Sequence, residues 1–209
     1  MGRMPTERGV RRSAAERAEQ LIDVAEALFI SKGYDRTSIG DIAAAAGVSR
    51  PVVYEYHGSK EGLYVAALQR AKRRLMEDYA AALAGLRDPH EILRAAADVW
   101  FSFVERDPDR WILLYGGSAV PLTGDLGERL ASVNAAGLGT YVGAIKQWVR
   151  PDVSDRSIEV TAHLIFGAAH QLARWFLENP DVNRDEVVER FADFCWAGMA
   201  PLLPGASDA

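Results

Sequence analysis

The 209-residue sequence predicts an all-α fold of two domains, an N-terminal three-helix domain with a helix-turn-helix and a larger C-terminal helical domain. Three observations lead to this prediction. Apolar residues recur at steps of three and four along almost the whole chain, which is the period of an α-helix. Capping residues, prolines and glycines divide these runs into about nine helices. No run alternates apolar and polar residues as a half-buried β-strand does.

The first helix is expected over residues 13–32. Its apolar residues share one face, and Gly33 follows it, since glycine readily adopts the left-handed conformation that ends many helices. Residues 1–12 precede this helix and include Arg11 and Arg12. We expect a flexible basic arm there, because chain termini without apolar anchors are usually mobile.

Two short helices are expected next, over residues 39–46 and 50–57, with Gly47 in the tight turn between them. Ser38 and Ser49 precede the two helices, and their hydroxyls can accept hydrogen bonds from free N–H groups of the first turn. Helix, short turn and second helix together form a helix-turn-helix.

The remaining helices are bounded by similar signals. Ser59 can cap the fourth helix, while Asp88–Pro89 and Asp107–Pro108 each place a cap before a proline. Helices are expected from residue 59, and over about 89–106, 108–114, 124–150, 154–179 and 184–201. The predicted domains are 13–58 and 59–201, with the arm 1–12 before them and a flexible tail 202–209 after them.

Composition excludes several classes of protein. The chain is 49% hydrophobic and 25% charged, which is ordinary for a globular protein. Its single cysteine, Cys195, excludes an internal disulfide and a cysteine-cluster metal site. No charge-free apolar run is long enough to span a membrane, and no secretory signal follows the N-terminal arginines. We expect a cytoplasmic protein that makes no membrane contact.

Metal ions, cofactors and catalytic residues are not expected either. His163 and His170 lie seven residues apart on one helical face, too far for the i, i+4 spacing of a helical metal pair. The segments around them contain no glycine-rich phosphate loop and no nucleophile elbow.

Charge and aromatic residues point to nucleic acid at the N-terminal end. Basic residues outnumber acidic ones over residues 1–75, whereas the rest of the chain is acidic, so this end suits a polyanion. In a helix-turn-helix the second helix lies in the DNA major groove. The helix over 50–57 carries two tyrosines that can face outward, and tyrosine hydroxyls can donate to phosphate oxygens. Lys60 adds a cation at the start of the next helix.

Several short segments occur in a characteristic order between residues 15 and 65. They are the helix end from Phe29 to Gly33, Thr37–Ser38, the segment DIAAAAGVS, Tyr54 and the segment SKEGLY. With these segments the chain resembles the TetR-type transcriptional regulators. Beyond residue 65 the resemblance is one of architecture only. Residue 57 departs from it, because the family usually has phenylalanine there; we expect His57 to pack under the recognition helix with its polar tip satisfied.

The resemblance implies a regulator that binds double-stranded operator DNA through its helix-turn-helix domain. It also implies a homodimer whose C-terminal domain binds a small-molecule effector. We therefore expect a DNA-binding transcriptional regulator, a repressor released from a pseudo-palindromic operator by a small lipophilic or aromatic effector. The DNA-binding residues are expected to be Thr37, Ser38, Ser49, Arg50, Pro51, Val52, Tyr54, Tyr56 and Lys60.

Large aromatic residues in the middle helices suggest the effector site. Trp100 and Phe103 are three residues apart, and Trp111 and Tyr115 are four apart, so each pair can point the same way. Glycines inside the helix predicted over 124–150 leave space beside these rings. We expect an apolar ligand cavity lined by Trp100, Phe103, Trp111, Tyr115 and Tyr141.

The last two helices mix small and large apolar residues, which suits close helix packing between two copies. By resemblance this region is the dimer interface. We expect it to include His163, Phe166, Gly167, His170, Arg174, Phe191, Phe194 and Cys195.

Other readings of these patterns stay open. Residues 37–64 could form a helical hairpin that only packs, each aromatic could be plain core, and the last two helices could simply complete the protomer. A homodimeric helical scaffold without DNA binding is one alternative function. A small all-α enzyme using His163, His170 and Cys195 is another, and it rests on residue types alone.

Overall fold

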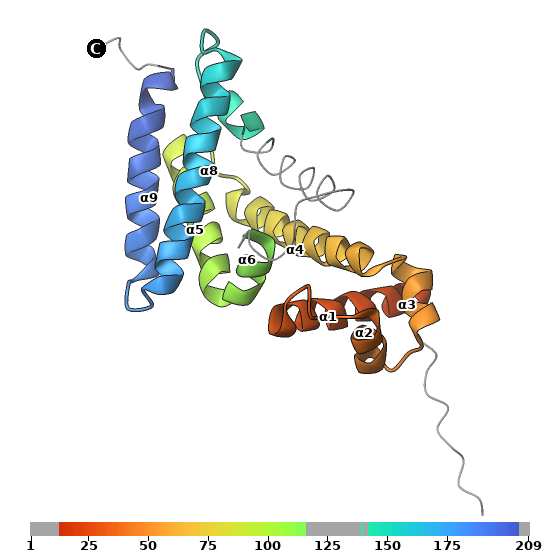
Figure 1. The fold of residues 1–209 in the computed structure, drawn as a ribbon. Coiled ribbons are helices and arrows are strands. Elements are labelled where there is room, and N and C mark those ends of the chain that lie inside the picture. The colour runs from red at the N-terminus through yellow and green to blue at the C-terminus, as the bar shows by residue number, and fades with distance from the viewer. Residues whose placement is uncertain (1–12, 116–138, 140–141, 205–209) are drawn as a thin grey trace, which may run out of the picture. The chain divides into compact units, whose positions relative to one another are not determined.

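The computed structural model describes residues 13–115, 139 and 142–204, and the regular elements within these ranges are all helices (Figure 1). The all-α fold class predicted from the sequence is therefore confirmed. None of the described helices combines the length and apolar composition needed to cross a membrane. The basic arm, Tyr141 and most of the helix predicted over 124–150 lie outside the described residues.

The chain forms two compact units, Met1–Ala67 (unit 1) and Leu68–Ala209 (unit 2). Unit 1 contains helices α1 (Ala14–Lys32), α2 (Ile39–Ala46), α3 (Arg50–His57) and the start of α4 (Lys60–Leu83). The sequence placed a boundary between residues 58 and 59, ahead of α4. The compact units divide later, between two residues of α4 itself.

The helices of unit 1 meet in a small apolar core. Leu21 of α1, Ile42 of α2, Val53 of α3 and Leu63 of α4 have no exposed surface. Burial of each such side chain contributes about 1.5–3 kcal/mol relative to exposure. Because one fully buried residue comes from each helix, the core fixes how α3 is held against the other three helices.

Unit 2 is built around α5 (Pro89–Arg106), which packs most extensively against α9 (Arg184–Met199). Two further helices also contact α5: α6 (Pro108–Tyr115) and α8 (Asp155–Glu178). The short 3-10 helix η1 (Ala200–Leu202) follows α9.

Local signals explain where the unit 2 helices begin, and ring packing explains their core. Asp88 caps α5 as predicted, because its carboxylate accepts hydrogen bonds from the N–H groups of His90 (3.0 Å) and Glu91 (2.9 Å).

Phe101 of α5 is completely buried, and its ring lies 5.6 Å from that of Phe191 and 6.2 Å from that of Phe176. One buried ring thus ties α5 to both α8 and α9.

Candidate nucleic-acid interface

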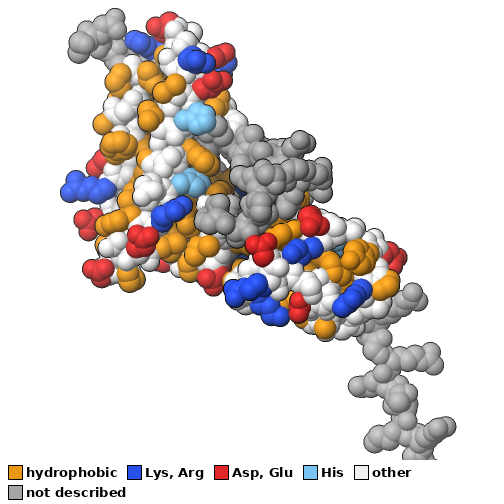
Figure 2. All heavy atoms as spheres, in the orientation of Figure 1, with side chains coloured by type: hydrophobic (Ala, Val, Ile, Leu, Met, Phe, Trp, Pro, Cys, Tyr) orange, Lys and Arg blue, Asp and Glu red, His pale blue; other side chains and the backbone are white. Residues whose placement is uncertain are grey.

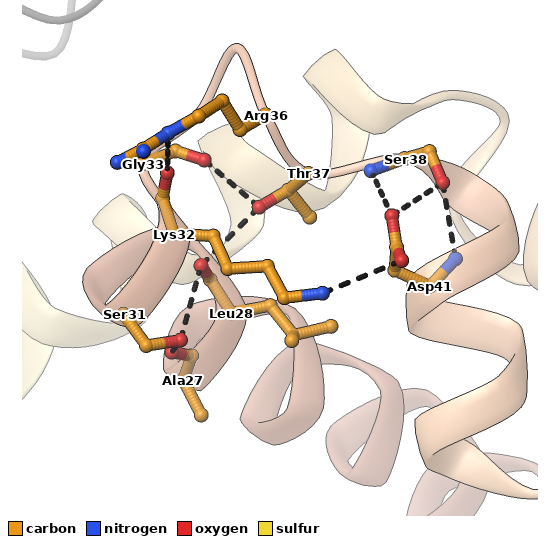
Figure 3. Close-up of polar contacts among 9 residues, drawn as sticks. All are labelled: Ala27, Leu28, Ser31, Lys32, Gly33, Arg36, Thr37, Ser38 and Asp41. Carbon is orange, nitrogen blue, oxygen red and sulfur yellow. Dashed lines mark hydrogen bonds and ion pairs between the residues drawn. The ribbon is translucent and has the colours of Figure 1, made fainter.

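Hydrogen bonds from side chains stabilise the connection between α1 and α2 (Figure 3). The hydroxyl of Thr37 donates to the carbonyl oxygen of Gly33 at 2.8 Å and to that of Leu28 at 3.2 Å. Only 1% of Thr37 is exposed. The structure therefore corrects the expectation that Thr37 contacts DNA, because its side chain is buried and its hydroxyl is used to hold the connection in place.

Ser38 begins α2 in a reciprocal cap with Asp41. The Ser38 N–H donates to the Asp41 carboxylate at 2.9 Å, and the Asp41 N–H donates to the Ser38 hydroxyl at 3.1 Å (Figure 3). The Ser38 hydroxyl also donates to the Asp41 carboxylate, at 2.5 Å. This hydrogen bond, with the one from the Ser38 N–H and with Lys32 at 3.4 Å, lowers the pKa of Asp41 to about 2. Ser38 is exposed at the helix N-terminus, but its N–H and its hydroxyl both donate to Asp41, so its contact with phosphate stays a prediction.

The turn between α2 and α3 depends on Gly47. Its φ of 67° and ψ of 36° are left-handed, a conformation that most side chains disfavour. The N–H of Gly47 donates to the carbonyl of Ala44 (3.2 Å), and the N–H of Val48 donates to that of Ala43 (3.0 Å). This turn and the buried Val53 together determine which face of α3 points outward.

The outward face of α3 contains residues predicted to touch DNA, together with Glu55, which is also exposed. Arg50 and Pro51 are exposed, as is Ser49 before them, and Tyr54 has 51% of its surface exposed. Val52 and Tyr56 are half-buried at the edges of this face. Ser49 was expected to cap α3, but its side chain makes no cap hydrogen bond in the described structure. One helix therefore presents a guanidinium and a phenol, with a free hydroxyl just before its first residue.

Arg50 lies across the first turn of α2. A Cβ atom added to Gly40 would come 2.7 Å from a terminal nitrogen of the Arg50 guanidinium and 3.2 Å from its Cζ atom. The missing side chain at Gly40 thus provides the space in which the guanidinium lies. Gly40 was not among the residues predicted from the sequence, although a glycine inside a short alanine-rich helix is a signal of close approach.

Lys60 contacts Tyr34 within unit 1. Its ammonium group donates to the carbonyl oxygen of Tyr34 at 3.0 Å and lies 4.1 Å from the centre of the Tyr34 ring, close enough for a cation–π interaction. The Tyr34 hydroxyl in turn donates to Glu61 at 3.0 Å. Burial and this carboxylate raise the pKa of Tyr34. One of the three donors of Lys60 is therefore committed to the protein, which leaves two for a phosphate.

His57, the departure from the family pattern, packs as expected. Its Nε2 atom lies 3.1 Å from the carbonyl oxygen of Ala18, so the side chain ties the end of α3 to α1. Because a carbonyl only accepts hydrogen bonds, Nε2 carries the proton. The prediction that the polar tip of His57 is satisfied inside the domain is confirmed.

Unit 2 contains an apolar cavity of about 200 Å³. Trp100 lines it, as predicted, together with three residues of α4 that the sequence analysis missed: Met76, Tyr79 and Leu83. These three recur at helical spacing on α4, which was the available signal. Tyr141 lies outside the described residues.

Three of the predicted effector residues lie elsewhere in unit 2. Phe103 and Trp111 are buried, and Tyr115 is half-buried. None of these three borders the described cavity. Their rings instead pack around Trp100, at centroid distances of 6.4, 6.4 and 5.2 Å respectively.

The residues predicted for the dimer interface separate into three groups by burial. Phe191 and Cys195 are buried in the core of the protomer itself, which removes them from the predicted set. Phe166 and His170 are half-buried, with their rings 3.9 Å apart. The residues that remain open to a partner are His163, Gly167, Arg174 and Phe194.

The structure adds large apolar residues to this surface. Leu164 and Val160 of α8 are 67% and 52% exposed, and Phe194 of α9 is 70% exposed. Figure 2 shows hydrophobic side chains gathered over α8 and α9 in unit 2. A Cβ atom at Gly167 would meet nothing within 4 Å among the described residues, so close packing against them does not explain this glycine.

Comparison with known proteins places this helix-turn-helix in a described family. Residues 21–67 match the family model for bacterial regulatory proteins of the tetR family. The HTH-type transcriptional activator FasR of Mycolicibacterium smegmatis is 28% identical over 196 residues, which covers 92% of this chain and 87% of that protein.

Two crystal structures resemble the whole chain. A TetR-like transcriptional regulator from Rhodococcus sp. RHA1 is 26% identical with a TM-score of 0.69, covering 91% of this chain and 99% of its own. A tetR-family transcriptional regulator from Streptomyces coelicolor is 29% identical with a TM-score of 0.66, covering 90% and 82%.

Proposed function

The chain belongs to the TetR family of bacterial transcriptional regulators, which bind DNA, and we propose that it is a repressor released from its operator by a small lipophilic effector. The observation that carries the DNA-binding part is the outward face of α3. Arg50 and Tyr54 are exposed on it, while Val53 on the opposite side is completely buried. A helix held this way can enter the major groove with its N-terminal residues toward the bases.

Arg50 and Tyr54 have different parts in this proposal. A guanidinium near the N-terminus of a recognition helix can donate two hydrogen bonds to guanine, which reads sequence. The phenol of Tyr54 and the ammonium of Lys60 suit phosphate oxygens, which position the protein without reading bases. Ser38 and Ser49 precede helix N-termini, where phosphate is also favoured.

We further propose a homodimer formed through the exposed apolar side chains of α8 and α9. Leu164 and Phe194 are more exposed than is usual for large apolar residues, and such patches commonly mark protein interfaces. Two recognition helices related by a two-fold axis require a pseudo-palindromic operator with half-sites about one DNA turn apart.

The effector is proposed to bind in unit 2, in the cavity bordered by Trp100 and by Met76 and Tyr79 of α4. Its apolar lining favours a lipophilic ligand. α4 runs without interruption from Lys60 to Leu83, so a ligand that moves its second half acts on a helix that begins in unit 1. Release of DNA requires the ligand to favour a conformation that does not fit the operator.

Whether the protein represses or activates transcription is the more specific part of the proposal. The relative from M. smegmatis is called an activator, and an activator makes the same kind of DNA contact as a repressor. Repression requires only that the bound dimer block the promoter, whereas activation requires an additional contact with the transcription machinery. A reporter gene behind the bound site distinguishes the two, since a repressor lowers its expression and deletion of the regulator raises it.

No catalytic function is proposed for Cys195 or the neighbouring histidines. Burial raises the pKa of the Cys195 thiol to about 12, so the thiolate needed for nucleophilic attack is scarce near neutral pH. The relatives that match the chain are named as regulators.

A gel-shift series tests the proposal directly. Full-length protein is titrated into DNA flanking its own gene, at several salt concentrations, with and without a panel of lipophilic small molecules. Saturable binding that resists competitor DNA, and its loss with one of the molecules, is the expected result. A dimer that binds no DNA would indicate the scaffold alternative.

A further inference from the structure

The apolar cavity of unit 2 is longer than it is wide. On α5 its lining residues recur from Pro89 to Trp100, a stretch of about 16 Å at about 1.5 Å per residue. On α9 both Phe191 and Met199 border the cavity, about 12 Å apart along the helix. A spherical cavity of the same volume, about 200 Å³, would be about 7 Å across, or about five residues of helix. The space therefore extends along α5 and is not compact.

The lining offers few hydrogen bonds to a ligand. None of the described lining residues is charged, and their polar side-chain atoms are those of Tyr79, Trp100 and Trp148. Nε1 of Trp100 already donates to the carbonyl oxygen of Ala169 at 3.2 Å. At most two polar side-chain atoms therefore remain for the whole length of the cavity. Along most of that length, a polar group of a ligand would lose its hydrogen bonds to water without replacement.

The lining is most exposed on α4 and most enclosed on α8 and α9. Met76 of α4 borders the cavity and has 38% of its surface exposed. The lining residues of the last two helices, among them Ile165 of α8 and Phe191 of α9, are all buried. Solvent is thus nearest to the cavity on its α4 side.

The volume of the cavity limits the size of the enclosed part of a ligand. An apolar cavity of about 150 Å³ can bind benzene, which has six carbon atoms. By the same scale, a cavity of about 200 Å³ holds about eight carbon atoms. An extended chain of about eight carbons is about 9 Å long, given C–C bonds of about 1.5 Å. Such a chain fits within the length bordered by Phe191 and Met199.

We propose that the effector carries an unbranched hydrocarbon chain of about eight carbons, and that this chain lies along α5 in the cavity. The enclosed chain has no polar substituent, and its polar end stays on the α4 side, beside Met76. Small lining side chains provide the room for it, at Ala96, Ala97, Ala144 and Ala169. This inference rests on the proposed effector function and extends it, because a lipophilic lining alone does not distinguish chains from ring systems.

Three isomers of one composition test the inference by isothermal titration calorimetry on the full chain. 1-Octanol has its hydroxyl at the end of a straight chain, 4-octanol has it inside the chain, and 2-ethyl-1-hexanol has a branched chain. Because the isomers contain the same atoms, the position of the hydroxyl and the shape of the chain decide their ranking.

We expect 1-octanol to bind about tenfold more tightly than 4-octanol, because the hydroxyl of 4-octanol is held among apolar side chains. It should bind about fivefold more tightly than 2-ethyl-1-hexanol, because the branch has to be fitted into a narrow space. Equal affinities of 1-octanol and either isomer, or no binding of 1-octanol, would overturn the proposal.

Ala97→Leu tests where the chain lies. Leucine at this buried lining position occupies part of the cavity, so the affinity for 1-octanol should fall about tenfold while that for the shorter 1-pentanol changes little. Ala96→Leu, at a half-buried lining position, should have the same effect and replaces Ala97→Leu if that variant does not fold. Thermal melting checks the folding of each variant.

Ala80→Leu is the matched control. Ala80 is exposed on α4 and does not border the described cavity, so both affinities should stay at the wild-type values. Wild-type affinity for 1-octanol in the folded Ala97→Leu and Ala96→Leu variants would show that the chain does not lie in this cavity.

The gel shift without any probe separates this inference from the proposed function. A protein that binds its operator but binds the three isomers equally remains a regulator, and only the straight-chain site is lost. A protein that prefers 1-octanol but binds no DNA retains this site and loses its role as a regulator.

Discussion

The backbone carbonyl oxygen of His57 occupies the space in which a side chain at Gly62 would begin. The first turn of α4 therefore approaches the end of α3 with backbone against backbone. The contact is reinforced by Ser59, whose N–H donates to the same His57 oxygen at 2.8 Å and whose hydroxyl accepts from the Gly62 N–H at 3.0 Å. This approach fixes where the recognition helix ends.

Gly62→Ala is expected to destabilise unit 1. Alanine normally stabilises a helix relative to glycine by up to about 1 kcal/mol. Here the added Cβ must displace backbone, and overpacking of this kind costs about 1–3 kcal/mol. Thermal melting should therefore show a lower Tm, and DNA affinity should fall with it. Gly198→Ala is the control, because a Cβ there meets no described atom within 4 Å. A Gly62→Ala protein at least as stable as the wild type would contradict the account.

Gly40→Ala should alter DNA recognition without lowering stability. The three atoms nearest the new methyl group all belong to the far end of the Arg50 side chain, which can move away at little cost. Selection of bound sites from random DNA should show a changed preference, since the guanidinium no longer lies over α2. In a double-mutant cycle, Gly40→Ala should have no further effect once Arg50 is alanine. Additive effects would mean that Gly40 acts through something other than Arg50.

Tyr54→Phe and Lys60→Ala should both weaken DNA binding, but only Lys60→Ala should also lower the stability of unit 1. Loss of the exposed Tyr54 hydroxyl should weaken binding several-fold on all sequences and leave Tm unchanged. Lys60→Ala should reduce the salt slope by about one counterion and also lower Tm, because the contact with Tyr34 is lost. Affinities measured over a salt series check both, and wild-type binding by the double variant would place the recognition helix elsewhere.

Leu164→Glu is expected to give monomers in sedimentation, because a charge replaces an apolar side chain that is 67% exposed on α8. Gly167→Trp should do the same by steric means. Operator affinity should fall in both variants, since two half-sites are no longer engaged together. Ile112→Glu is the matched control, with 53% exposure on α6 outside the proposed interface. Dimers of Leu164→Glu with normal DNA binding would move the interface to another surface.

The cap of α2 should give unit 1 a measurable dependence on pH. Hydrogen bonds from Ser38 lower the pKa of Asp41 from 3.8 to about 2. The carboxylate therefore stabilises the folded state above about pH 4, and this contribution is lost as the pH falls through about 2. Asp41→Asn should have a lower Tm at pH 7, and its difference from the wild type should shrink between pH 4 and pH 2. A difference that is constant over this range would contradict the assignment.

The helix-turn-helix could be predicted closely because its signals are local. Ser38 and Gly47 mark the ends of α2 through hydrogen bonds to residues at most four positions away. The same sequence gave no indication that Thr37 is buried or that Gly40 accommodates Arg50. Both facts depend on how α1, α2 and α3 cross, and the crossing arises from packing between residues distant in the sequence.

Unit 2 was less predictable for the same reason. Helical spacing correctly paired Trp100 with Phe103 and Trp111 with Tyr115, but it could not say which ring faces the cavity. Small residues in α8 predicted close packing between two copies; Gly167 is exposed as such an interface requires, and the interface itself stays a prediction. In α9 the same mixture of small and large apolar residues led to a wrong expectation for Cys195, because this side chain is buried in the core of its own protomer.

The division of the chain inside α4 restricts how such regulators can be recombined. A hybrid that joins this unit 1 to the effector unit of another protein has to be spliced within a continuous helix. One residue added or removed there turns everything beyond the junction by about 100° and shifts it by about 1.5 Å. Functional chimeras should therefore tolerate changes of sequence at the junction but not changes of length, unless whole turns are inserted.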